Sequence, residues 1–159
     1  MQFGGAHRAD GPEQPGVLVA EDDENDICLI RRAFQKAQFE HPVSVVKDGE
    51  EALAYLQGLE PYTDRQCHPP PALVLLDLKM PRKNGFEVLE WIRDQPEFNH
   101  LPVVVLTSSQ EGADISRAYA LGANSYLVKP ANFASLVEMM NRLRQFCSFT
   151  RQNVGVNWI

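Results

Sequence analysis

The sequence has no apolar segment that approaches the roughly 20 residues needed to cross a bilayer, and it has only three cysteines among 159 residues. Because the cysteines are scattered and odd in number, they indicate neither a disulfide framework nor a metal site. Acidic residues outnumber basic ones by 21 to 15, and the net charge of −6 argues against direct nucleic-acid binding. The residues before position 16 contain no apolar core that would form a secretory signal. These absences predict a cytoplasmic protein that binds neither membranes nor nucleic acids.

The composition predicts one folded domain between two tails. Residues 1–15 are rich in glycine, proline and polar side chains, which predicts a flexible tail. Residues 16–146 form the predicted domain, and residues 147–159 form a second tail that is too short for a DNA-reading domain. We therefore expect no fused output domain. The second tail is apolar, and the sequence allows two predictions for it: it is either disordered or docked on a protein surface.

Strand and helix patterns alternate along the predicted domain. Short apolar runs, which are typical of buried strands, occupy residues 17–20, 43–46, 72–76, 103–106 and 125–128. Each run is followed by a segment with apolar residues at helical spacing. Five strand–helix repeats predict an α/β fold, in which a five-stranded parallel sheet carries helices on both faces.

Polar side chains directly follow four of the five runs: Glu21 and Asp22, Asp77, Thr107, and Lys129. Because the carboxyl ends of parallel strands meet at one edge of a sheet, where such sheets bind ligands, we expect these side chains to lie together. Neighbouring carboxylates repel each other, and Mg²⁺ relieves that repulsion by binding one or two carboxylates and an incoming phosphate. A lysine and a hydroxyl at the same edge would bind phosphoryl oxygens. The pattern therefore predicts a site for a divalent cation and a phosphoryl group.

The acidic run Glu21-Asp22-Asp23 allows two registers for that site. Counting from the end of the first strand makes Glu21 and Asp22 the site pair and leaves Asp23 to cap the following helix. The shifted register, in which Asp22 and Asp23 form the pair, is the alternative.

Four stretches of the sequence carry a resemblance to a known family. They are Val17-Leu18-Val19-Ala20-Glu21-Asp22, Leu75-Leu76-Asp77-Leu78-Lys79-Met80-Pro81 with Asn84-Gly85, Val105-Leu106-Thr107-Ser108, and Tyr126-Leu127-Val128-Lys129-Pro130. In these motifs and in their spacing, residues 17–146 resemble the receiver domain of two-component response regulators. The resemblance implies the (βα)5 flavodoxin-like receiver fold.

The resemblance also implies roles for the acidic residues. Asp77 would be the phosphoacceptor. The metal ligands would be Asp22, Asp77 and the backbone carbonyl of Lys79, with Glu21 completing the acidic pair. The metal would be Mg²⁺, for which Mn²⁺ can substitute.

Further roles are implied at the last two strand ends. Lys129 would bind the phosphoryl group, and Thr107 would contact the same oxygens. Thr107 and Tyr126 would form a coupled switch pair. The Lys129–Pro130 bond would be cis, as in relatives, and Gly85 would be a structural position.

The insert at residues 60–71 and the stretch 125–133 are similar to stand-alone regulators paired with bacterial phytochromes. This similarity implies a single-domain response regulator that accepts a phosphoryl group from a sensor histidine kinase of the phytochrome type. Such a protein is a signalling switch rather than an enzyme, apart from self-catalysed phosphorylation and dephosphorylation. It passes the signal to a downstream target protein by a conformational change.

The fifth predicted helix carries more apolar residues than one core-facing stripe requires. They are Phe133, Leu136, Val137, Met139, Met140, Leu143 and Phe146. The excess predicts a homodimer through the face formed by the fourth helix, the fifth strand and the fifth helix. A monomer whose fifth helix is covered by the apolar tail is the alternative.

Two other classes of function stay open. An aspartyl-phosphate phosphatase on a similar fold would need a second acid two residues after its nucleophile, where this sequence has Lys79. A receiver-like docking module that works without phosphorylation would lack the lysine or one of the acids, and this sequence has both.

Overall fold

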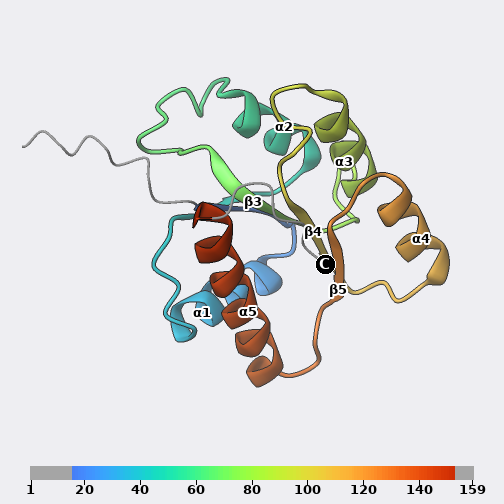
Figure 1. Ribbon diagram of the computed structural model, residues 1–159. Helices are drawn as coiled ribbons and strands as arrows, with labels where there is room; N and C mark the ends of the chain where they lie inside the picture. The colour runs from blue at the N-terminus through green and yellow to red at the C-terminus, as the bar shows by residue number, and fades with distance from the viewer. Residues whose placement is uncertain (1–15, 153–159) are drawn as a thin grey trace, which may run out of the picture.

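The computed structural model describes residues 16–152, with side chains described as far as Cys147. Strands and helices alternate along the chain as predicted (Figure 1): β1 Gly16–Ala20, α1 Glu24–Lys36, β2 Val43–Val46, α2 Gly49–Gln57, β3 Pro71–Leu76, α3 Gly85–Asp94, β4 Val103–Thr107, α4 Gly112–Ala120, β5 Ser125–Val128 and α5 Phe133–Gln152. The five strands pair in parallel in the order β2-β1-β3-β4-β5. This arrangement confirms the predicted α/β fold.

Helices cover both faces of the sheet, with α1 and α5 on one side and α2, α3 and α4 on the other (Figure 1). Successive side chains of a strand point to opposite faces. In β1, Val17 and Val19 therefore pack with α1 and α5, whereas Leu18 and Ala20 pack with the other three helices. Every residue of β1 is buried, which explains why the strand is a continuous apolar run rather than an alternating one.

Side-chain caps start three helices at the carboxyl edge of the sheet. Asp23, Asp48 and Asn84 each accept a hydrogen bond from a backbone amide in the first turn of α1, α2 and α3, respectively. Because the helices begin where the strands end, these caps hold the connecting loops at that edge. After α4, Gly122 has a φ of +106°, which glycine adopts freely and which ends the helix.

Helix α5 is longer than the predicted domain boundary at residue 146 implies. It runs to Gln152, and Cys147, which was expected in the tail, is 1% exposed and packs in one cluster with Met140 and Leu143. Helix α5 therefore crosses the predicted boundary, and the division of the chain at residue 146 stays a prediction. The predictions for residues 1–15 and 153–159 concern segments outside the described residues. Within residues 16–152, no helix has both the length and the hydropathy that crossing a membrane requires.

The insert at residues 60–71 packs against α2. Arg65 Nη1 donates hydrogen bonds to the carbonyl oxygens of Tyr55 and Tyr62, at 2.8 and 3.2 Å. The Tyr55 hydroxyl donates to the carbonyl of Pro69 at 2.9 Å. Since the insert joins the end of α2 to the start of β3, it lies at the amino edge of the sheet. It therefore lies at the edge opposite the polar strand ends.

Candidate functional site

The polar residues predicted from the strand ends meet at the carboxyl edge of the sheet. Backbone pairing places them there, because Ala20 and Leu76 are register partners in the β1–β3 pair. The amide of Asp77 donates to the carbonyl of Ala20 at 3.0 Å, so the acids that follow β1 and β3 start side by side. At the neighbouring strands, the amide of Lys129 donates to the carbonyl of Thr107 at 2.8 Å.

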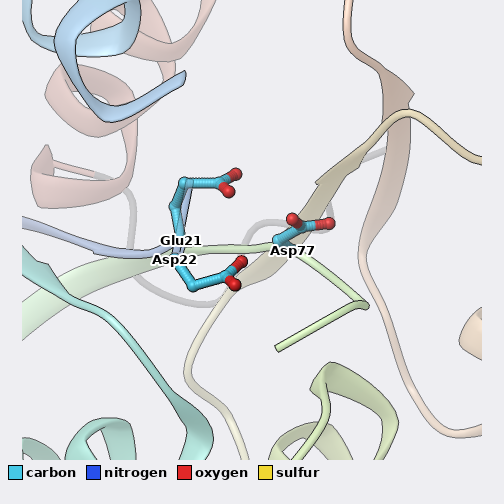
Figure 2. A group of neighbouring side chains, drawn as sticks. All are labelled: Glu21, Asp22 and Asp77. Carbon is cyan, nitrogen blue, oxygen red and sulfur yellow. The ribbon is translucent and has the colours of Figure 1, made fainter. Parts of the chain in front are cut away.

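Three carboxylates form a compact group at this edge. Oxygen atoms of Glu21, Asp22 and Asp77 all lie within 4.8 Å of one another. Figure 2 shows the side chains of Glu21 and Asp22 extending towards the side on which Asp77 lies. Glu21 is 2% exposed and Asp77 is 7% exposed, whereas Asp22 is exposed to solvent. The group is therefore buried on one side and open to an incoming ion on the other.

The hydrogen bonds at the start of α1 support the first of the two registers. Asp23 Oδ1 accepts a hydrogen bond from the amide of Asp26 at 3.0 Å, so Asp23 is the helix cap. Glu21 Oε2 accepts from the amide of Asp23 at 3.0 Å, which turns the Glu21 side chain back over the strand end. Glu21 and Asp22 are thus the pair beside Asp77, as the first register predicts.

Lys129 places its ammonium among carboxylates of this group. Its Nζ lies 2.7 Å from Glu21 Oε1, 2.7 Å from Asp26 Oδ2 and 3.3 Å from Asp77 Oδ2. The lysine side chain is only 16% exposed. Charge-assisted hydrogen bonds of this length are among the strong ones in proteins. Lys129 therefore joins β5, α1 and the ends of β1 and β3 at one point.

The ionisation of the site follows from its burial and its charges. Burial raises the pKa of Glu21 to about 7, although hydrogen bonds from Lys129 and from the Asp23 amide oppose that rise. Burial lowers the pKa of Lys129, but its hydrogen bonds to Asp26 and Glu21 outweigh burial, so the net pKa lies above the ordinary value. The ammonium of Lys129 is one positive charge among the carboxylates of Glu21, Asp22, Asp26 and Asp77.

The donor set fits a hard divalent cation. All three clustered ligand atoms are carboxylate oxygens, which are the ligands that Mg²⁺ and Mn²⁺ prefer. The single positive charge of Lys129 does not balance the carboxylates at this edge, and the remaining negative charge also favours binding of a divalent cation. Asp22 is exposed, and Asp77 lies 3.3 Å from the Lys129 ammonium. Each of them can therefore turn an oxygen towards such an ion without breaking either of the shorter, 2.7 Å ion pairs that Lys129 makes.

One expectation about Lys129 was wrong. The Lys129–Pro130 bond is not cis; among residues 16–152 the cis bond is Glu60–Pro61. The trans form of a bond before proline is favoured by about 0.5–1 kcal/mol. With the trans bond in place, the Lys129 ammonium lies 3.3 Å from Asp77 Oδ2.

Thr107 and Tyr126, the predicted switch pair, are linked through Ser109. Thr107 is 1% exposed, and its Oγ1 accepts a long hydrogen bond of 3.5 Å from the amide of Ser109. The hydroxyl of the partly buried Tyr126 donates to the carbonyl of Ser109 at 3.0 Å. The Ser109 hydroxyl in turn donates to Asp114 at 2.7 Å, which fixes the loop to α4. Thr107 and Tyr126 therefore both contact the same loop.

The loop after β3 explains the other two predicted positions. A Cβ on Gly85 would lie 2.3 Å from the carbonyl oxygen of Asp77, so any larger residue would displace the strand end. This close approach is consistent with the structural role predicted for Gly85. The Lys79 side chain is exposed, and the structure gives it no contact with the acidic group. The role predicted for Lys79 rests on its backbone carbonyl and stays a prediction.

Sequence reasoning missed Asp26 and Ser109. Asp26 lies in the first turn of α1, three residues after the helix cap Asp23, and so in a helix that begins at the site. An acid in that first turn was the available signal for Asp26. Ser109 follows Thr107 by two residues in a loop, where no periodicity indicates which groups it will contact.

Comparison with known proteins places this geometry in a family. A family model described as the response regulator receiver domain matches residues 17–141. Response regulator Rcp1 of Synechocystis is 35% identical over 82% of this chain and 86% of its own length. An Mn²⁺-bound structure of Rcp1 has a TM-score of 0.74 and 34% identity, over 89% of this chain and 98% of its own.

Two further solved structures are similar to this chain. One is response regulator RPA3017 in red light signaling of R. palustris. Its TM-score is 0.78, and it is 42% identical over 83% of this chain and 92% of its own. The phosphorylated cyanobacterial phytochrome response regulator RcpA has a TM-score of 0.77 and 36% identity over 86% of this chain and 96% of its own. The chain belongs to the response regulator receiver domain family.

Proposed function

We propose that this protein is a response regulator that accepts a phosphoryl group on Asp77 from a sensor histidine kinase. The observation that carries the proposal is the position of the Lys129 ammonium, 3.3 Å from Asp77 Oδ2 and beside the paired acids Glu21 and Asp22. A carboxylate nucleophile, a cation for the phosphoryl oxygens and oxygen ligands for a metal are the parts that phosphoryl transfer requires.

The reaction is an in-line displacement at phosphorus. An Asp77 oxygen forms a bond to phosphorus, the bond from phosphorus to the histidine nitrogen breaks, and its electron pair leaves with the nitrogen. The product is an acyl phosphate on Asp77. Lys129 binds phosphoryl oxygens and holds them in place, because its ammonium already lies within hydrogen-bonding distance of the nucleophile.

We propose Mg²⁺ as the resident cation, held by Asp22, Asp77 and the Lys79 carbonyl with Glu21 nearby. When bound, Mg²⁺ neutralises the charge of the carboxylates and of the phosphoryl oxygens. The oxygen-only donor set supports a hard divalent cation, and the Mn²⁺-bound structure of Rcp1 supports Mn²⁺ as a substitute.

The signal would pass from Thr107 to Tyr126 through the loop that contains Ser109. A Thr107 hydroxyl that turns to the phosphoryl oxygens gives up its long bond to the Ser109 amide, which frees the loop to move. In this loop, the Ser109 carbonyl accepts a hydrogen bond from the Tyr126 hydroxyl, and the Ser109 hydroxyl donates one to Asp114. Phosphorylation would therefore alter the face formed by α4, β5 and α5, to which a downstream target protein would bind.

The partners and the compartment are further parts of the proposal. Similarity to the phytochrome response regulator RcpA and to RPA3017, a response regulator in red light signaling, supports a kinase of the phytochrome type. Tyr119, 49% exposed on α4, supports self-association through the face of α4, β5 and α5. The free, exposed thiols of Cys28 and Cys67 support a reducing compartment such as the cytoplasm.

A phosphotransfer assay tests the proposal. A phytochrome-type histidine kinase is allowed to phosphorylate itself with labelled ATP, and is then mixed with this protein in Mg²⁺ or in EDTA. We expect label to pass to the wild type in Mg²⁺, and to be absent with EDTA or with Asp77→Asn. Label on Asp77→Asn equal to that on the wild type would refute the assignment of the phosphoacceptor.

A further inference from the structure

Asp26 contacts Lys129, yet the proposed reaction gives Asp26 no role. Asp26 Oδ2 lies 2.7 Å from Lys129 Nζ, which is 0.6 Å closer to the ammonium than Asp77 Oδ2 is, at 3.3 Å. The two residues are 103 positions apart in the sequence, so the contact exists only because α1 and the end of β5 meet at the site. Asp26 does not belong to the group of Glu21, Asp22 and Asp77 that could hold a metal ion.

The helix holds Asp26 in a defined place. Its amide donates to Asp23 Oδ1 at 3.0 Å, and its side chain is 34% exposed beside a lysine that is 16% exposed. Glu24, the other acid in the first turn of α1, points elsewhere and pairs with Lys47. The contact with Lys129 is therefore specific to Asp26 and is not a general consequence of negative charge at this helix end.

The charges at the site change when the reaction begins. Glu21 and Asp77, the other two partners of Lys129, belong to the group that would hold the cation, and Asp77 becomes an acyl phosphate. Asp77 is then committed to the phosphoryl group, and Glu21 lies beside the cation. Asp26 is the one carboxylate among the three contacts of Lys129 that lies outside the group that would hold the cation.

We propose that Asp26 is a positioning residue for phosphoryl transfer, which holds the Lys129 ammonium beside Asp77 while Glu21 and Asp77 bind the cation and the phosphoryl group. This inference rests on the proposed function. Without Asp26, Lys129 has only Glu21 and Asp77 as carboxylate partners, and it draws closer to the nucleophile that must stay free to attack. Asp26 acts through Lys129 and does not itself touch the reacting atoms.

The test measures the rate constant of phosphorylation by acetyl phosphate at saturating Mg²⁺, so that metal affinity does not limit the rate. We expect Asp26→Ala to be about tenfold slower than the wild type, which is the size expected when one charge-assisted hydrogen bond at the site is lost. Asp26→Asn keeps an acceptor oxygen without the charge, and we expect an intermediate rate. Glu24→Ala, the matched variant in the same helix turn, should stay within about twofold of the wild type.

A second background separates positioning from a structural effect. In Lys129→Met, whose residual rate is already low, adding Asp26→Ala should cause no further loss, because residues that act as one unit are not additive. A wild-type rate for Asp26→Ala would overturn the inference. The same tenfold loss in the Lys129→Met background would also overturn it, since Asp26 would then act independently of the lysine. Absence of phosphorylation in the wild type itself would refute the proposed function and this inference with it.

Discussion

The guanidinium of Arg82 lies 2.7 Å from the carboxylate of Asp48, and this ion pair ties the loop after β3 to the start of α2. Asp48 is 2% exposed, and its other oxygen caps α2 by accepting from the amide of Glu51 at 2.8 Å. A Cβ on Gly49 would lie 2.2 Å from the carbonyl of Lys83, so the two loops also approach each other closely. The loop after β3, which contains Lys79, is therefore fixed by contacts with the start of α2 rather than by the acidic group of the site.

We predict that Asp48→Ala lowers the free energy of unfolding by about 1–2 kcal/mol at neutral pH, chiefly through loss of the helix cap. Burial raises the pKa of Asp48, but the Glu51 amide and Arg82 outweigh it, so the net pKa lies below the ordinary 3.8. The stabilisation is thus complete above the unfolded pKa and is lost as the pH falls through the lower folded value. Urea unfolding of both proteins should show the difference shrinking only below about pH 4.

The backbone of Arg82 supplies the control for that experiment. Its φ is +67°, a conformation that a residue with a side chain adopts at a cost but that glycine adopts freely. Arg82→Ala and Arg82→Gly both remove the ion pair, and we predict that the glycine variant is the more stable of the two. A glycine variant less stable than the alanine variant would contradict this account of the loop.

Magnesium should stabilise the folded protein through Asp22. A ligand that binds only the native state adds about 2.7 kcal/mol at a hundredfold excess over its Kd. We predict that Mg²⁺ raises the melting temperature of the wild type and that Asp22→Ala abolishes most of that rise. Asp23→Ala is the matched control, because it removes the helix cap at the neighbouring residue. It should melt lower without metal and keep its rise with Mg²⁺; a loss of the rise in Asp23→Ala alone would point to the shifted register.

The switch can be separated from phosphorylation at Thr107. Thr107→Val keeps the buried shape of the side chain and removes the hydroxyl that contacts the Ser109 amide. We predict that phosphorylation of the wild type changes hydrogen exchange in residues 107–115 and around Tyr126. Thr107→Val should still be phosphorylated but should show a smaller change there. Exchange that is the same in both states of the wild type would refute the switch.

Self-association through the face of α4, β5 and α5 predicts a dimer at micromolar concentration in sedimentation velocity, with the phosphodonor present. Tyr119→Ser should shift the population towards monomer, because exposed aromatic residues often contribute 1 kcal/mol or more at interfaces, roughly a factor of five in affinity. Leu59, 51% exposed in a different part of the surface, offers the matched control Leu59→Ser. A wild type that is monomeric with and without phosphodonor would remove the dimer from the proposal.

The positions of β1, β3 and β4 and the residues at their ends were predictable because these strands are largely buried on both faces and so form continuous apolar runs. The edge strands β2 and β5 are only partly buried, and their apolar runs are correspondingly shorter. The ion pair between Lys129 and Asp26 was not predictable in the same way, since it depends on how α1 packs beside the end of β5. The burial of Cys147, which lies in the predicted tail, was not predictable either, because it depends on how α5 packs against the sheet together with Met140 and Leu143.

Intact-mass measurement after incubation with acetyl phosphate and Mg²⁺ tests the central claim most directly. The wild type should gain the mass of one phosphoryl group, and peptide mapping should place it on Asp77. Asp77→Asn should gain none, and Lys129→Met, which retains the nucleophile without the ammonium at 3.3 Å, should gain it far more slowly. A wild type that gains no mass, or an Asp77→Asn variant that gains as much as the wild type, would contradict the account.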